Sequence, residues 1–168
     1  MATFFTSDTH FGDHRTLNIH KRPFESVGEM NAALVANWNA AIGPEDEVWH
    51  LGDFARTQNQ IPQFLSGLAG RKHLVRGNND PASVTTVMGW ESVQNYRELE
   101  LDGHRLVLCH YPFRSWNGQH RKSINLHGHS HGRLKKVARQ VDVGVDAWDF
   151  RPIDLASILS ARGMEARA

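Results

Sequence analysis

Five short apolar segments of this chain each run directly into a turn that carries Asp, Asn or His. These segments are residues 2–7, 47–51, 72–75, 104–109 and 123–126. Short apolar runs that stop at turn-forming residues are typical of buried β-strands. In α/β folds the loops at one end of the strands build the site, so residues remote in sequence meet there. The pattern therefore predicts an α/β fold with one polar site at its strand ends.

Helices are predicted between and after these strands. Ser26 and Glu29 have the spacing of a capping box, and apolar residues then recur every three or four positions until a Gly-Pro pair ends the pattern. A second helical stretch lies around residues 61–68. A proline inside the start and Gly163 past the end indicate a closing helix over residues 152–162.

The second half of the chain favours antiparallel pairing. An Asp-Gly pair at residues 102–103 stands between two strand-like segments, 97–101 and 104–109, and this pair is the strongest short-range signal for a hairpin. Two further strands are predicted over residues 134–137 and 141–145. Alternating strands and helices followed by a run of strands indicate a mixed α/β sandwich rather than a purely parallel sheet.

Length and composition limit the remaining choices. The chain has 168 residues, which favours a single domain over residues 1–168. Its net charge of +1, from 19 Lys and Arg against 18 Asp and Glu, provides no overall field for nucleic acid or a membrane surface. Cys109 is the one cysteine, and no apolar stretch approaches the ~20 residues that span a bilayer. Because Met1 to Ser7 also lead at once into polar residues, we expect a cytoplasmic protein with no membrane role.

Histidine is the unusual component, with 11 His in the chain. The polar turns hold more candidate metal ligands than one ion can use, so two neighbouring ions are expected. Histidine nitrogens together with carboxylate and amide oxygens suit Mn, Fe, Zn, Ni or Co. The candidates are Asp8, His10, Asp53, Asn78, Asn79, Asp80, His110, His129 and His131.

The order of these motifs resembles that of the calcineurin-like metallophosphoesterase superfamily. Asp-x-His, Gly-Asp, Gly-Asn-x-Asp, His and Gly-His-x-His follow one another across residues 8–131. The surrounding sequence, including Arg22-Pro23-Phe24, is similar to small stand-alone bacterial and phage members. The resemblance implies a sandwich of two mixed β-sheets flanked by helices, and two metal ions. The first ion would be held by Asp8, His10, Asp53 and His131, and the second by Asp53, Asn78, His110 and His129.

The same resemblance implies a phosphoesterase in which a hydroxide that bridges the two ions attacks phosphorus. Two divalent ions about 3.5–4 Å apart lower the pKa of a bridging water and clamp the phosphoryl oxygens. Mn²⁺ is the expected ion, with Fe, Zn, Ni or Co as alternatives. Two such ions, two aspartates and a hydroxide carry a net charge of about +1. A nearly neutral protein would thus attract a phosphate-ester small molecule or a nucleotide.

One motif departs from the superfamily's usual pattern. The usual Gly-Asn-His-Asp has a histidine that protonates the leaving group, and Asn79 stands in that place here. An amide can hydrogen-bond a phosphoryl oxygen but cannot act as a general acid, and this loss costs roughly 10²–10⁴-fold for poor leaving groups. We therefore expect phosphodiesters rather than alkyl phosphomonoesters as substrates, with Asn79 and Asp80 as catalytic candidates. Histidines that can replace the missing acid are His14, His120 and His127.

Other residues are candidates for holding the substrate. Arg56, three positions after the Gly-Asp motif, can reach a phosphate for binding and catalysis, or remain a surface residue. Arg114 and Trp116 follow the fourth strand in a loop over the expected site, where a guanidinium and an indole suit a nucleotide or an aryl phosphate. Surface packing explains this pair equally well. His14 and Asn79 complete the predicted substrate-binding set.

Alternative functions stay open. The same site would also suit phosphomonoesters or dinucleotide polyphosphates. A protein-interaction scaffold on the same fold, as in the retromer subunit that resembles this superfamily, would be expected to lack ligands, and here the expected positions are filled. Nucleic acid is not indicated as a substrate, although a basic run over residues 133–139 can steer polyanions or form a solvated face. A homodimer is compatible with the superfamily.

Overall fold

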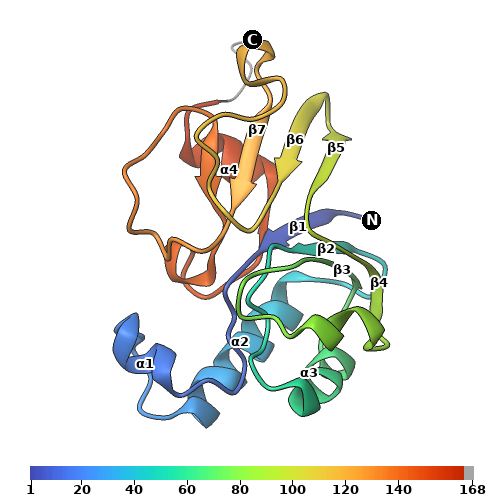
Figure 1. Cartoon of the computed structure of the whole chain (residues 1–168), viewed down its shortest axis with the longest axis vertical. Coiled ribbons are helices and arrows are strands. Elements are labelled where there is room, and N and C mark those ends of the chain that lie inside the picture. Colours follow the sequence, from blue (N-terminus) through green and yellow to red (C-terminus); the bar gives the residue numbers. More distant parts are fainter. Residues whose placement is uncertain (165–168) are drawn as a thin grey trace.

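The computed structural model describes residues 1–164 and contains two mixed β-sheets flanked by helices, as the motifs predicted (Figure 1). The larger sheet has the order β4-β3-β2-β1-β9, and the smaller one the order β5-β6-β7-β8. The strands are β1 (Thr3–Thr6), β2 (Glu47–His50), β3 (Arg71–Val75), β4 (Trp90–Gln94), β5 (Arg97–Leu101), β6 (His104–Leu108), β7 (Ile124–His127), β8 (Gln140–Asp142) and β9 (Ile153–Asp154). The helices are α1 (Arg15–Ile19), α2 (Val27–Ala41), α3 (Ile61–Gly67) and α4 (Leu155–Ala161).

The strands that lead into the polar turns run parallel within each sheet. β1, β2 and β3 are parallel neighbours in the larger sheet, and β6 and β7 are parallel neighbours in the smaller one. A bridge between Ser7 and Gly144 joins the end of β1 to the segment after β8. Because the carboxyl ends of parallel strands share one edge, the five polar turns are brought to the same region of the molecule.

Both faces of the larger sheet are apolar, because successive side chains along its strands point to opposite faces. Phe5 and Trp49 belong to a core that also contains Leu106 and Leu126 of the smaller sheet, so this core lies between the sheets. Val48, beside Trp49 in sequence, belongs to a second core with the buried residues of α2, which are Met30, Leu34 and Trp38. The strand ends are therefore held rigidly from both sides.

α1 was not predicted, and the other helices follow the sequence signals with one correction. Ser26 caps α2 and accepts a hydrogen bond from the Glu29 N–H at 3.1 Å, as the capping box predicted. The closing helix begins at Leu155 rather than Pro152, because residues 153–154 pair with β1 as β9 and Asp154 caps the helix. Within residues 1–164, no helix is long and apolar enough to cross a membrane.

Two differences concern strands. The strand predicted over residues 134–137 was wrong: this segment is an open loop in which Leu134 and Val137 are 55% and 47% exposed. An isolated apolar pair cannot form a strand without a neighbouring strand to pair with. Conversely, β4 was not predicted, because its polar sequence Trp-Glu-Ser-Val-Gln is stabilised only by parallel pairing with β3 at the edge of the sheet.

Candidate metal centre

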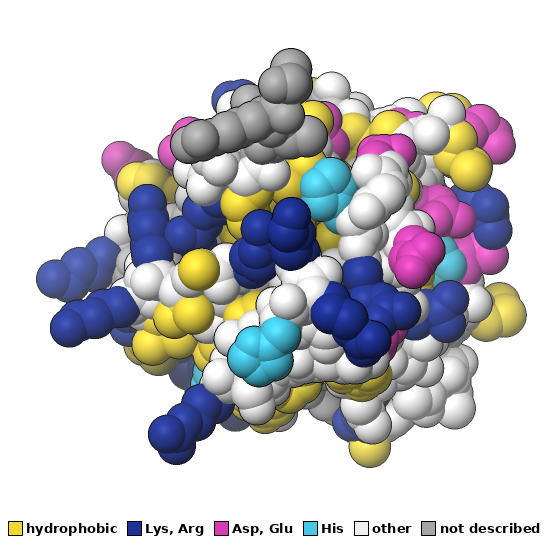
Figure 2. All heavy atoms as spheres, turned by 90° about the horizontal axis from the view of Figure 1, so that it is seen from above, with side chains coloured by type: hydrophobic (Ala, Val, Ile, Leu, Met, Phe, Trp, Pro, Cys, Tyr) yellow, Lys and Arg dark blue, Asp and Glu magenta, His cyan; other side chains and the backbone are white. Residues whose placement is uncertain are grey.

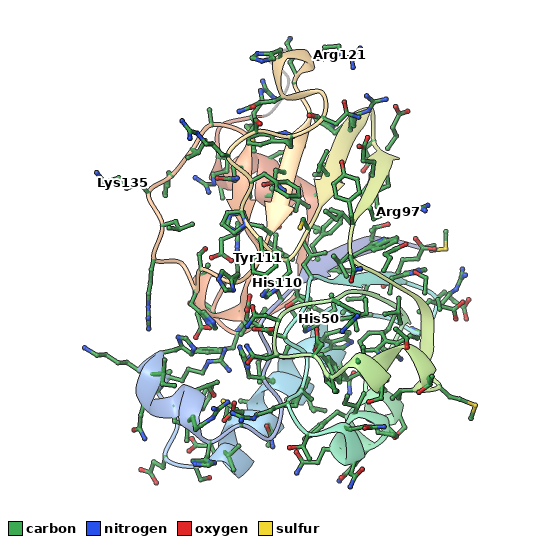
Figure 3. The ribbon with its side chains drawn as sticks, in the orientation of Figure 1. His50, Arg97, His110, Tyr111, Arg121 and Lys135 are labelled. Carbon is green, nitrogen blue, oxygen red and sulfur yellow. The ribbon has the colours of Figure 1, made fainter. Side chains whose placement is uncertain are left out.

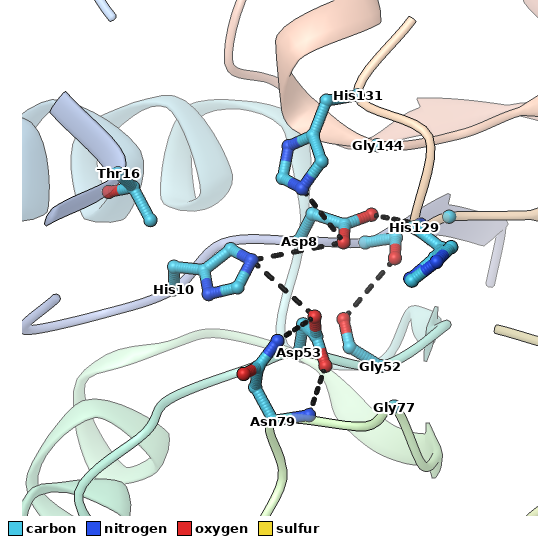
Figure 4. A network of polar contacts seen from close by, with 12 residues as sticks. Asp8, His10, Thr16, Gly52, Asp53, Gly77, Asn79, His129, His131 and Gly144 are labelled. Atoms are coloured by element: carbon cyan, nitrogen blue, oxygen red, sulfur yellow. Dashed lines mark hydrogen bonds and ion pairs between the residues drawn. The ribbon is translucent and has the colours of Figure 1, made fainter. Parts of the chain in front are cut away.

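The polar turns after five strands converge on one site, and Figure 4 shows those after β1, β2, β3 and β7. Asp53 lies at its middle, with its Oδ2 3.5 Å from His10 Nε2 and 3.6 Å from His110 Nε2. Asp8 Oδ1 lies 3.9 Å from His10 Nε2 and 3.7 Å from His131 Nε2. Metal–ligand bonds of about 2.0–2.2 Å bring two ligands of one ion to similar separations. Five predicted ligands are thus close enough to share one or two ions.

The backbone of these turns is strained at predicted ligands. Residues other than glycine rarely adopt a positive φ, and such conformations cost of order 1–3 kcal/mol each. Positive φ angles occur at Asp8 (58°), His10 (50°), Asp53 (56°), His129 (67°) and His131 (48°). Because strain of this kind gathers at functional sites, the backbone points to the same turns as the motifs do.

Close packing of neighbouring turns imposes this geometry. The Asp8 N–H donates to the Gly52 carbonyl at 2.9 Å, and the His10 N–H donates to the Asp53 carbonyl at 3.0 Å. Gly52 has a φ of 97°, and a methyl group in place of its hydrogen would lie 2.5 Å from the Gly77 nitrogen. Glycine is therefore needed where the turn after β2 meets the turn after β3.

Asp80 anchors these two turns to each other. Its carboxylate accepts the backbone N–H groups of Asp53, Phe54 and Gly77, each at 2.8 Å. Asp80 is buried, and burial raises its pKa to about 6 even though the three donors act in the opposite direction. Because both carboxylate oxygens accept these bonds, Asp80 holds the turn that carries Asp53, and its catalytic role stays a prediction.

Asp146 fixes the orientation of His131. His131 Nδ1 lies 2.7 Å from Asp146 Oδ2, so Nδ1–H donates and Nε2 keeps its lone pair on the side of Asp8. Asp146 also accepts two hydrogen bonds from the buried Arg22, at 2.9 and 2.8 Å. Burial would raise the pKa of Asp146, but the hydrogen bonds from His131 and Arg22 hold it well below its ordinary value. A carboxylate behind a histidine is the usual outer support of a metal ligand.

We expect Asp146→Asn to lower the affinity for Mn²⁺ by roughly 10–100-fold, because losing an outer partner of a ligand typically costs that much. Isothermal titration of metal-stripped protein with Mn²⁺ measures this change. Asp149→Asn is the matched control, since Asp149 is exposed and only three residues away. Equal affinities of the Asp146→Asn protein and the wild type would refute the supporting role of Asp146.

His110 is oriented by a backbone carbonyl. Its Nδ1 lies 2.8 Å from the Leu51 carbonyl oxygen, so Nδ1–H donates and Nε2 carries a lone pair. That Nε2 lies 3.1 Å from Asn78 Oδ1, which is also an acceptor, and 3.6 Å from Asp53 Oδ2. Three acceptor atoms that face one another at these distances are what a cation needs and what a hydrogen-bond network would avoid.

Two ligands predicted for the first metal ion contain buried polar atoms that lack hydrogen-bond partners in the described part of the chain. Within residues 1–164, Asp8 Oδ1 and both ring nitrogens of His10 are buried and have no hydrogen-bond partner. Such an atom typically costs about 1–3 kcal/mol when nothing pairs with it. Burial raises the pKa of Asp8 well above its ordinary value and lowers that of His10 to about 4. A divalent cation would give both residues a partner, so the donor set fits a metal ion.

Asn79 lies directly beside Asp53. Its side-chain amide donates to Asp53 Oδ2 at 2.7 Å, and its backbone N–H donates to Oδ1 at 2.8 Å (Figure 4). Burial alone would raise the pKa of Asp53, but His110 and Asn79 lower it below its ordinary value. An amide has a second N–H, which can donate to another acceptor.

Comparison with known proteins decides the family. The family model of the calcineurin-like phosphoesterase superfamily domain matches residues 1–145, which include every predicted ligand. The chain belongs to this superfamily. Membership implies hydrolysis of phosphoesters with the help of divalent metal ions, and it agrees with the donor set just described.

Relatives of this phosphoesterase match it over nearly the whole chain. An uncharacterized protein of Methanocaldococcus jannaschii is 28% identical, covering 93% of this chain and 88% of its own. The Gene 66 protein of Mycobacterium phage L5 is 30% identical and covers 87% of each chain. A solved structure, a protein of unknown function from Aquifex aeolicus, is 25% identical with a TM-score of 0.79, covering 95% of this chain and 98% of that one.

Two predicted substrate residues of the phosphoesterase lie in one cavity. Arg56 and His14 are exposed and line a cavity of about 350 Å³ together with Arg15. The cavity also includes Asp13, whose N–H donates to the His10 carbonyl at 3.0 Å. It therefore lies next to the turn that carries the first predicted ligands.

Arg114 and Trp116, which were predicted as a pair, have different surroundings. Arg114 is exposed in the loop after β6. Trp116 is 9% exposed, and its indole N–H donates to the Ser123 carbonyl at 3.3 Å. The tryptophan thus serves packing, while the arginine stays accessible to a ligand.

The three histidines named as replacement acids are widely separated. His120 lies in an exposed turn beside Arg121, which Figure 3 shows far from His110. His127 is buried, and its Nδ1 lies 2.8 Å from a backbone carbonyl oxygen. Of the three, His14 is the one that shares a cavity with Arg56.

Three residues at the centre of the phosphoesterase were not predicted. The His20 ring stacks on His131, with ring centroids 3.5 Å apart. Arg22 donates to the Asp8 carbonyl at 2.6 Å and pairs with Asp146 at 2.8 Å. The Arg-Pro-Phe segment was the one signal for Arg22, because His20 and Asp146 stand in no motif and reach the site only through the folded chain.

Proposed function

We propose that this phosphoesterase hydrolyses phosphodiester bonds at a centre of two divalent metal ions, with Mn²⁺ as the expected ion. The observation that carries the proposal is the position of Asp53 between two groups of ligand atoms, at 3.5 Å and 3.6 Å from their nearest histidine nitrogens. The first group is Asp8, His10 and His131, and the second is Asn78, His110 and His129.

The two groups differ in accessibility. Asp8 and His10 of the first group are buried, whereas Asn78 and His129 of the second group are exposed and only its third member, His110, is buried. A substrate can therefore approach on the side of the second group. When bound, two divalent ions supply a water of lowered pKa and neutralise charge that develops on the phosphoryl oxygens. Asp80, Asp146 and the Leu51 carbonyl hold the ligands in place for this chemistry.

The preference for diesters rests on Asn79. Its amide can donate to a phosphoryl oxygen, but it holds no proton that it can transfer to a leaving group. The leaving oxygen must then depart without general acid help from this position. Diesters with acidic leaving groups tolerate this better than alkyl monoesters do, because their leaving groups need less protonation.

Initial rates on bis(p-nitrophenyl) phosphate and on an alkyl phosphomonoester such as glycerol phosphate test the proposal. The protein is first stripped of metal and then reloaded with Mn²⁺. We expect diester turnover that returns only with metal and exceeds monoester turnover by about tenfold or more. As a matched variant, Asn79→His restores the superfamily's usual motif and should shift the ratio of the two rates toward the monoester.

Other outcomes would contradict the proposal in distinct ways. Equal or faster monoester turnover would refute the argument from Asn79 and favour a phosphomonoesterase. Rates that do not depend on added metal would refute the metal centre. No turnover of either ester by protein that holds two Mn²⁺ ions would favour the scaffold function.

A further inference from the structure

The charge of this protein is strongly divided along the sequence. Residues 103–141 contain eight Lys and Arg and no Asp or Glu, whereas the other 129 residues contain 11 Lys and Arg against 18 Asp and Glu. The net charge of +1 therefore hides a basic segment and an acidic remainder. The eight cationic residues are Arg105, Arg114, Arg121, Lys122, Arg133, Lys135, Lys136 and Arg139.

These side chains form an exposed basic surface around β6 and β7. Seven of the eight are exposed, and Arg139 is half-buried. Arg105 lies 3.9 Å from Glu100, and none of the other seven makes an ion pair within residues 1–164. Figure 2 shows Lys and Arg side chains across the left and centre of the upper face, with most Asp and Glu toward its right and upper rim. Figure 3 shows Lys135 and Arg121 on the half that holds β6 and β7.

The basic surface is continuous with the metal centre. The Arg133 guanidinium lies 3.2 Å from His20 Nδ1, and the His20 ring stacks on His131. His131, Lys135 and Lys136 are among the residues that line one cavity of about 430 Å³. A chain of phosphates bound along this loop would therefore pass close to His131, one of the predicted ligands.

Apolar groups are exposed in the basic loop and beside the metal centre. Leu134 and Val137, which alternate with the basic residues of the loop, are 55% and 47% exposed. Tyr111, 45% exposed, packs its ring against His110 and His129 at centroid distances of 5.0 and 4.8 Å. A basic surface with exposed aromatic and apolar groups is suited to a chain that offers both phosphates and unpaired bases.

We propose that this surface binds a single-stranded nucleic acid and leads its phosphodiester backbone into the metal centre. The inference rests on the proposed function, since it names a polymer as the substrate class of that site. Phosphates contact the cations of the loop over residues 133–139, and a base next to the scissile phosphate stacks on Tyr111. A small phosphomonoester would use none of these groups.

Binding is tested apart from catalysis, in EDTA, by the fluorescence anisotropy of a labelled DNA single strand of about 20 nucleotides. The variant is Lys135→Ala/Lys136→Ala. The charge-matched control is Arg71→Ala/Arg151→Ala, which removes two exposed cations outside residues 103–141. We expect the variant to weaken binding at least about fivefold and to reduce the slope of log Kd against log salt by about 1.4, because each phosphate contact of a single strand contributes about 0.7. The control should bind as the wild type does.

Several results would overturn the inference. Equal weakening by the variant and the control would show that overall charge, and not this surface, determines binding. Tighter binding to the matching duplex, or to phosphatidylserine vesicles, than to the single strand would assign the surface to another ligand.

Hydrolysis of bis(p-nitrophenyl) phosphate with Mn²⁺ separates the two proposals. If the strand binds as expected but the small diester is not hydrolysed, the proposed function fails; if the diester is hydrolysed but the strand does not bind, the inference fails.

Discussion

Asp53→Asn is expected to reduce the Mn²⁺-dependent hydrolysis of bis(p-nitrophenyl) phosphate by at least about 10³-fold. Removing an outer partner of a metal ligand typically costs 10–100-fold in affinity or activity. The loss should be larger for Asp53, because Asp53 is expected to ligate both ions itself. Its carboxylate lies within 3.6 Å of histidines from both ligand groups, and no other predicted ligand has this position in the described chain. The measurement is the initial rate at saturating Mn²⁺.

The control for this variant is Asp102→Asn in the exposed turn between β5 and β6. It removes the same charge and should leave the rate unchanged. Thermal unfolding in EDTA shows whether the Asp53→Asn protein is folded. Because His110 and Asn79 hold the pKa of Asp53 below its ordinary value, its charge stabilises the metal-free fold, so the Asp53→Asn protein should unfold cooperatively with a somewhat lower Tm. A folded Asp53→Asn protein with more than a tenth of the wild-type rate would contradict its role as the shared ligand.

Arg22→Ala is expected to cost about 3–5 kcal/mol of the free energy of unfolding, because breaking a buried ion pair leaves an uncompensated charge. The Arg22 side chain is 0% exposed and its partner Asp146 is 9% exposed. Arg22 also donates to the carbonyls of Asp8 and Thr9 at 2.6 and 3.0 Å, which holds the strained turn after β1. Urea unfolding of metal-free protein in EDTA measures the loss.

A surface arginine gives the matched comparison. Arg71 is 47% exposed and lies 3.7 Å from Glu47 and 3.6 Å from Glu91. Arg71→Ala should cost less than about 1 kcal/mol, as exposed ion pairs usually do. If Arg22→Ala cost no more than Arg71→Ala, Arg22 would not be the support of the first turn.

The predicted site residues came from motifs, and their support came from the folded chain. The motif order pointed to Asp53, His110 and His131, and the structure brings them together. The partners behind them, such as Asp146 and the Leu51 carbonyl, have no local sequence signal because they meet the ligands across distant turns. The motif included Asp80, but it did not indicate that its carboxylate accepts three backbone N–H groups, among them that of Asp53.

In the fold too, local patterns were predicted from the sequence, whereas features that depend on distant contacts were not. Strands with strong apolar runs and the capped helix α2 were predicted from local patterns. β4 was missed and the strand over residues 134–137 was wrong, because in both cases the outcome depends on whether a neighbouring strand is present. The basic segment over residues 103–141 was hidden by the overall net charge, and its position beside the metal centre follows only from the packing of the two sheets.

The number of Mn²⁺ ions bound per chain tests the central claim most directly. Metal-stripped protein is dialysed to equilibrium against Mn²⁺ and its metal content is measured by mass spectrometry. The placement of Asp53 between two ligand groups predicts two ions per chain in the wild type and fewer in Asp53→Asn. One ion or none in folded wild-type protein at saturating Mn²⁺ would contradict a centre of two metal ions.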